Sequence, residues 1–243
     1  MNYRVKYDYH THTVFSHGKG TIEDNVKVAL EKGLQSVAIS DHGPGHVLYG
    51  VNSDKTKNMR KEIERLRELY RDIEIFLSIE ANIMNIGNNL DLSEQEIKEY
   101  DFINAGYHLG IKNGYGGENL FYKLSKIPLS GKKNLMKKNT DMVVKAVYEN
   151  PIKVLTHPGG KTLFDIVEIA KACADRGTLL EISAHHKNLT AEDIKLASNI
   201  ANAQFIVSSD AHMPGNVGEC QAAIQRALAA GLDMSRIVNI EEC

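Results

Sequence analysis

Short apolar runs rich in β-branched residues alternate along the chain with longer segments of helical period. This alternation is typical of β-α units whose strands form a parallel sheet, because such strands are covered on both faces. Seven runs predict strands, at residues 4–9, 36–40, 74–79, 102–107, 152–156, 178–182 and 204–208. A weaker eighth run spans residues 236–240. The pattern predicts an α/β fold.

The segments between the runs carry helix signals. Thr21 can cap a helix that ends near Lys32, while Ser93 and Thr190 each precede an acidic residue by three positions, which is the spacing of a capping box. Within residues 54–71, apolar side chains recur at helical spacing and predict one buried stripe with the charges facing solvent. The stripe consists of Met59, Ile63, Leu66 and Leu69.

One segment departs from this rhythm. Residues 109–139 are rich in Gly and Lys and contain one acidic residue, Glu118. We expect a long basic loop insertion, which could be either a lid over a functional site or a flexible surface loop. Outside it there is no internal repeat or linker, so residues 1–243 are expected to form a single domain.

Charge and cysteine content exclude several classes of function. Lys and Arg number 29 and Asp and Glu number 31, so no overall field attracts nucleic acid or an anionic membrane. No apolar run is long enough to span a membrane, and residues 1–10 lack the layout of a signal peptide, so we expect a soluble cytoplasmic protein. The three cysteines have no paired spacing, which argues against a disulfide framework or a thiolate zinc site.

The histidines follow the predicted strands. His10 and His12 come directly after the first run, and residues two apart on a strand point to the same side. Imidazole is a common metal ligand, so this pair can face one cation.

The later strands end in the same kinds of side chain. Each is a polar group placed immediately after an apolar run, namely His42, Glu80, His108, His157, Asp210 and His212. In a barrel of parallel strands the carboxyl ends gather on one rim, where active sites are found. Their convergence predicts a metal site.

These motifs together resemble the PHP superfamily, named for polymerase and histidinol phosphatase. The resemblance covers nearly the whole chain and is closest to the stand-alone bacterial metallophosphatases of that superfamily. It rests on residues 10–12, His17, residues 40–42, Glu80, His108, residues 157–158 and residues 210–212. It implies a distorted (β/α)7 TIM-like barrel and three divalent metal ions, with zinc expected first and manganese or iron as alternatives.

The resemblance also implies which residues hold each ion. His10, His12, Glu80 and Asp210 correspond to the ligands of the first ion. His108 and His157 hold the second together with Glu80, whose carboxylate bridges the pair. The third set is His17, His42 and His212.

Other polar residues are candidates for substrate contacts. Lys161 lies in a glycine turn that could either receive a phosphate oxygen or be a plain turn. His185 and His186 follow the sixth run and are candidates for substrate binding. His46 is expected to be an ordinary loop histidine. Asp41 could orient a ligand or cap a helix.

The reaction expected is hydrolysis of a small-molecule phosphate monoester by a metal-bound hydroxide, with Glu80 and Asp210 acting through the metal. No Gly-x-Ser-x-Gly elbow is present, which argues against a serine nucleophile. Three alternatives stay open: a phosphodiesterase or nuclease, a histidinol-phosphate phosphatase, and a non-catalytic binding module. The composition favours a small phosphorylated substrate over nucleic acid, and it predicts neither the substrate nor the oligomeric state.

Overall fold

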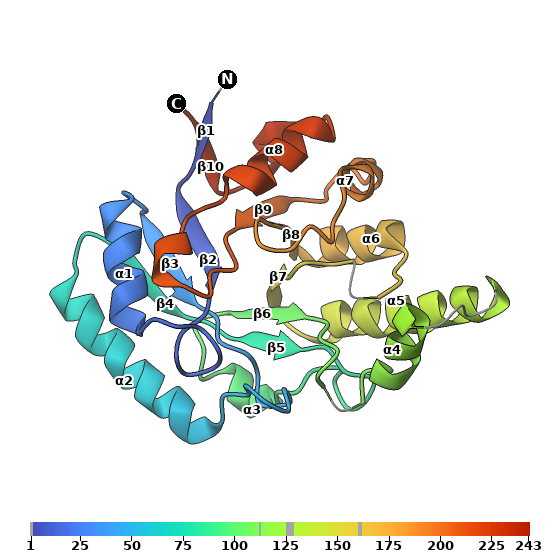
Figure 1. The fold of residues 1–243 in the computed structure, drawn as a ribbon, viewed down its shortest axis with the longest axis horizontal. Helices are drawn as coiled ribbons and strands as arrows, with labels where there is room; N and C mark the ends of the chain where they lie inside the picture. Colours follow the sequence, from blue (N-terminus) through green and yellow to red (C-terminus); the bar gives the residue numbers. More distant parts are fainter. Residues whose placement is uncertain (1, 112, 125–128, 160–161) are drawn as a thin grey trace.

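The computed structural model describes residues 2–111, 113–124, 129–159 and 162–243 (Figure 1). Most of its strands lie where the apolar runs predict them, but a short strand at residues 80–82 follows the run 74–79 and was not predicted. The strands are β1 (Tyr3–Val5), β2 (Tyr7–Thr11), β3 (Ser36–Ile39), β4 (Glu74–Leu77), β5 (Glu80–Asn82), β6 (Ile103–Gly106), β7 (Ile152–Leu155), β8 (Leu179–Ser183), β9 (Phe205–Ser208) and β10 (Ile240–Glu242).

Two parallel sheets make up the centre of the molecule. One has the order β2-β3-β4 and the other the order β5-β6-β7-β8-β9. Single parallel bridges join the sheets at both seams, Thr11 to Ala211 on one side and His42 to Glu80 on the other. The result is the predicted distorted (β/α)7 barrel, in which β4 and β5 share one of the seven strand positions.

Helices surround this barrel, and several of them begin at the predicted capping residues. The helices are α1 (Ile22–Glu31), α2 (Ser53–Leu69), α3 (Glu94–Ile97), α4 (Gly116–Leu124), α5 (Leu129–Glu149), α6 (Ile166–Arg176), α7 (Ala191–Ser198) and α8 (Gln221–Ala229). Capping boxes at Thr21, Ser93 and Thr190 are confirmed. In the described part of the chain, no helix combines the length and apolarity needed to cross a membrane.

The core explains why these segments fold as they do. The central strands β3, β6, β8 and β9 are buried along their full length, as expected for strands covered on both faces. One apolar cluster extends from Ile22 to Ile240 and includes the α2 residues Met59, Ile63 and Leu66. The prediction for Leu69 is wrong: it is 57% exposed because α2 ends there and the next residue, Tyr70, packs against the core instead.

The prediction of a loop across residues 109–139 is also wrong. This stretch contains α4 and the first half of α5. Leu135, Met142, Val143 and Ala146 are buried along one face of α5, whereas Lys137 and Lys138 reach Asp141 and Glu118 on its exposed side. The high lysine content suggested a loop, but the segment contains the start of an amphipathic helix whose apolar stripe continues beyond residue 139.

The chain termini form a separate ribbon. The run 4–9 is divided between β1 and β2, and β1 pairs with β10 in antiparallel register. The weak run at 236–240 therefore supplies only the start of β10, which adds no barrel strand. Figure 1 shows both termini at the top of the view, at the outer end of the ribbon that β1 and β10 form.

Candidate metal centre

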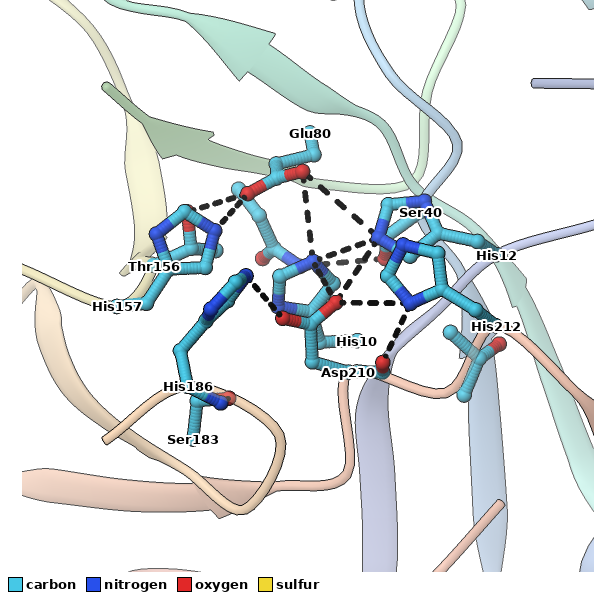
Figure 2. Close-up of polar contacts among 12 residues, drawn as sticks. His10, His12, Ser40, Glu80, Thr156, His157, Ser183, His186, Asp210 and His212 are labelled. Atoms are coloured by element: carbon cyan, nitrogen blue, oxygen red, sulfur yellow. Dashed lines mark hydrogen bonds and ion pairs between the residues drawn. The ribbon is translucent and has the colours of Figure 1, made fainter. Parts of the chain in front are cut away.

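The predicted strand-end residues meet at one cavity. His10 lies in β2 and Glu80 begins β5, while His42, His108, His157 and Asp210 lie two or three residues beyond the ends of β3, β6, β7 and β9. The cavity has a volume of about 350 Å³, and Figure 2 shows the imidazoles and carboxylates pointing toward one another across it. The barrel places them together because all the parallel strands end on the same rim.

Glu80 is the most central group. Its Oε1 lies 2.8 Å from His157 Nε2 and 3.3 Å from His108 Nε2. Its Oε2 lies 2.9 Å from His42 Nδ1 and 3.5 Å from His10 Nε2. Burial raises the pKa of this carboxyl, but the surrounding imidazoles, above all that of His108, outweigh burial and hold the pKa well below its usual value. Glu80 is therefore a charged carboxylate with each oxygen facing a different group of histidines.

Asp210 is the second carboxylate of the site. Its Oδ1 lies 3.2 Å from His12 Nε2 and its Oδ2 lies 3.4 Å from His186 Nε2. Asp210 has a φ of 53° and His157 a φ of 29°, both in the left-handed region that non-glycine residues rarely adopt. Backbone strain of this kind costs on the order of 1–3 kcal/mol and clusters at functional sites.

A second group consists of histidines alone. It contains His12, His17, His42 and His212. Each contributes one ring nitrogen, and these four nitrogens lie within 4.8 Å of one another. Burial lowers the pKa of His17 to about 3 and that of His212 to about 4, with neighbouring imidazoles adding to the effect. Burial likewise lowers the pKa of His12 well below its usual value. Imidazole binds metals in the neutral form, which this environment favours.

Buried side chains behind the ligands fix their orientation. Glu181 Oε1 lies 2.7 Å from His10 Nδ1, and Glu181 Oε2 accepts a hydrogen bond from the His157 backbone N–H at 2.6 Å. Asn82 Oδ1 lies 2.8 Å from His108 Nδ1, and Thr156 Oγ1 donates to Glu80 Oε1 at 2.7 Å. Such contacts leave the opposite ring nitrogen directed at the cavity.

The residues present fit divalent cations. The buried ring nitrogens His12 Nδ1 and His17 Nδ1 have no hydrogen-bond partner among the described residues. An unsatisfied buried polar atom costs about 1–3 kcal/mol, and coordination to a cation removes that cost. Burial lowers the pKa of His10, but Glu181, Asp210 and Glu80 raise it well above its usual value, so this site attracts positive charge. Nitrogen and carboxylate oxygen donors suit zinc, manganese and iron.

The structure brings together every residue predicted as a ligand. Among the described residues, five groups of three or four side chains have the spacing of metal ligands. Between them they contain His10, His12, His17, His42, Glu80, His108, His157, Asp210 and His212. His186, predicted as a substrate contact, forms one such group with His157 and Asp210. His185 is exposed and lines the cavity. Lys161 lies outside the described residues.

Some residues around the site were not predicted. Glu181 is an acidic residue inside the apolar run 178–182, and that signal was available in the sequence. The expectation of an ordinary loop position for His46 is wrong, since its ring stacks on His42 at 4.9 Å and lines the cavity. Asp41 is buried and accepts hydrogen bonds from the Thr13 N–H and the Ser16 hydroxyl, so it holds the segment that leads to His17.

The fold and site define a class: parallel α/β barrels that gather histidines and carboxylates at their strand ends to hold divalent metals. The chain belongs to the PHP domain family, whose model matches residues 8–185. It is 27% identical to a protein named "Probable phosphatase" from Shewanella frigidimarina, over 96% of this chain and 88% of the relative. It is 29% identical to another protein so named, from Shewanella sp. strain W3-18-1, over 98% of this chain and 88% of the relative.

A solved structure shares the fold. Histidinol phosphate phosphatase from Lactococcus lactis, in complex with zinc, L-histidinol and phosphate, superposes with a TM-score of 0.64. The match covers 93% of this chain and 94% of that protein at 16% sequence identity. This likeness supports the barrel architecture. The family assignment rests on the match between residues 8–185 and the PHP domain family model.

Proposed function

We propose that the protein is a metal-dependent phosphatase that hydrolyses a phosphate monoester of a small molecule, and that residues 1–243 act as one PHP domain. The observation that carries the proposal is the position of Glu80, whose two oxygens face His157 and His108 on one side and His42 and His10 on the other. A carboxylate shared in this way is suited to bridge two cations. Curated relatives named as phosphatases support the same activity.

Three divalent cations are proposed, with zinc first and manganese or iron as alternatives. His10, His12, Glu80 and Asp210 would hold one, Glu80 with His108 and His157 a second, and His17, His42 and His212 a third. The close spacing of His10, His12 and Asp210, with Glu80 beside both imidazoles, supports the first set, and the spacing of His17, His42 and His212 supports the third. The second set is supported by Glu80 Oε1, which lies 3.3 Å from His108 Nε2 and 2.8 Å from His157 Nε2. His186 is close enough to Asp210 and His157 to join the first or second set.

The chain's own residues prepare the site for phosphate. When bound, the cations would supply Lewis acidity that lowers the pKa of coordinated water and neutralises phosphoryl oxygens. The neutral imidazoles of His12, His17 and His212 occupy ligand positions without cancelling that positive charge. Glu181 and Asn82 hold His10 and His108 in place, so that little reorganisation is needed when substrate binds.

Turnover of defined esters by the metal-loaded protein tests this proposal. We expect release of phosphate from an aryl phosphate monoester and much slower hydrolysis of the corresponding bis-aryl diester. Histidinol phosphate belongs in the same screen, because a histidinol-phosphate phosphatase is one of the alternatives that the family resemblance leaves open. Faster cleavage of the diester, or of a labelled oligonucleotide, would favour the phosphodiesterase alternative. Inertness toward all of these esters would favour a binding module.

A further inference from the structure

A groove of about 700 Å³ lies next to the catalytic cavity. Its walls come from the loop after β3 and from the segment between β5 and α3. His46 lines both the groove and the cavity, so the two spaces meet at this side chain. A phosphoryl group held at the metal ligands would therefore have room for the rest of its molecule beyond His46.

The junction is held by backbone contacts. The Tyr49 N–H donates to His46 Nδ1 at 3.3 Å. His46 and Ile111 form an antiparallel bridge, and the Val47 N–H donates to the Gly110 carbonyl at 3.1 Å. Backbone hydrogen bonding therefore fixes the segment that separates the groove from the cavity.

The groove lining is apolar with neutral polar groups. Val47, Met84, Leu90 and Leu92 supply apolar surface, and Asn88, Asn113, Ser93 and His46 supply hydrogen-bonding groups.

One acidic residue lies in its wall. Asp91 is the one carboxylate among the described lining residues, it accepts from the backbone N–H groups of Gly45 and Asn82 at 2.7 Å each, and burial raises its pKa. No lysine or arginine among the described lining residues is available to bind a second phosphate.

We propose that this groove is the leaving-group subsite of the same active site and that it takes an extended, partly apolar leaving group without a second anionic group. The proposal rests on the proposed phosphatase function, because it assigns the part of the ester that leaves. Its volume is in the range of small-molecule sites, which bury most of the surface of their ligands. The substrate would then be a phosphate monoester with one anionic end and an uncharged tail.

Binding of alkylphosphonates tests the subsite without turnover. Ethylphosphonate, hexylphosphonate and hexane-1,6-bisphosphonate would be titrated into the metal-loaded protein by calorimetry. We expect hexylphosphonate to bind at least about tenfold more tightly than ethylphosphonate, because four further methylenes leave water. The bisphosphonate should bind no more tightly than hexylphosphonate, because no lysine or arginine among the described lining residues would pair with its second charge.

A substitution in the groove wall tests whether the chain-length preference arises in the groove. Val47 is 63% exposed, so Val47→Glu should fold and should abolish the preference for the hexyl chain. Ile86→Glu is the matched control, since Ile86 is 49% exposed on the neighbouring segment and is not a lining residue. This control should keep the wild-type preference.

The outcomes separate the subsite from the function. Equal affinity for the ethyl and hexyl compounds, tightest binding of the bisphosphonate, or a hexyl preference that survives Val47→Glu would each overturn the subsite. A hexyl preference in a protein that cleaves no phosphate monoester would leave the subsite standing and remove the proposed function. Hydrolysis of phenyl phosphate without any chain-length preference in phosphonate binding would leave the proposed function standing and remove the subsite.

Discussion

The inner and outer halves of the metal centre are built differently. The inner half consists of Glu80, His10, His157 and Asp210, which are buried and lie in strands or within two residues of a strand end. The outer half contains His17 and His212, which are partly exposed and lie on loops. Glu181 hydrogen-bonds to two inner residues, whereas His17 is held mainly by ring contacts with His42, His212 and Tyr49.

This difference has a consequence for metal binding. Ligands locked by buried hydrogen bonds lose little freedom on coordination, whereas a loop histidine must be ordered. Both carboxylates lie in the inner half, so the attraction for cations is also greater there. We expect inner ions to be held tightly and the outer ion to exchange more readily.

Complete metal removal should have the largest effect. A strong chelator is expected to abolish phosphatase activity, and added zinc or manganese should restore it. Activity and metal content would be followed together during chelation. The outer ion should leave first, before most activity is lost. Simultaneous loss of all metal would show that the two halves do not differ in affinity.

Glu80→Gln should come next, because it removes the charge that faces both sets of histidines. We expect kcat toward an aryl phosphate to fall by roughly 10²–10³-fold or more, the scale of a lost electrostatic group in an active site. Bound metal should fall as well. Glu64→Gln, at an exposed position on α2, is the matched control and should leave kcat unchanged. Near-normal turnover by Glu80→Gln would contradict the bridging role.

Glu181→Gln tests the support behind the inner half. Its loss should weaken the orientation of His10 and of the His157 backbone, and it should lower activity or metal affinity by about 10–100-fold. Metal titration alongside kinetics distinguishes this from unfolding, since excess metal should recover part of the activity. No change in either quantity would mean that Glu181 is only a packing residue.

His17→Ala tests the outer half and should have a smaller effect on activity. We expect a fall below about tenfold, less than that of the inner partner Glu181. The variant should also lose its most weakly held ion at chelator concentrations that the wild type withstands. An effect equal to that of Glu80→Gln would remove the distinction between the two halves.

Thr21→Ala should change stability alone. Thr21 caps α1 and forms a capping box with Asp24. Losing the cap should lower the free energy of unfolding by about 1 kcal/mol. Urea denaturation would measure this, and kcat should be unchanged. A large fall in kcat would mean that α1 positions the neighbouring loop of His17.

Much of the centre could be predicted because strand ends converge in a parallel barrel. His10, Glu80, His157 and Asp210 each lie at the end of an apolar run, so local sequence was sufficient to find them. His46 was missed because its approach to His42 depends on the path of a loop, which no local pattern encodes. The same holds for Asn82, whose contact with His108 joins two different strands.

The errors in the fold have a similar cause. Lysines in residues 109–139 suggested a loop, although the buried residues Leu135 and Met142 lie at helical spacing across the end of that segment. Leu69 fitted the apolar stripe of α2 by spacing, yet tertiary packing selected Tyr70 instead. Periodicity identifies elements well and their ends poorly.

A crystal structure of the metal-loaded protein, with anomalous scattering recorded at the zinc and manganese edges, tests the central claim most directly. We predict anomalous peaks on both sides of the Glu80 carboxylate, one among His10, His12 and Asp210 and one beside His108 and His157, with a weaker peak near His17. Absence of any peak within coordination distance of Glu80, in crystals that bind these metals elsewhere, would contradict the account.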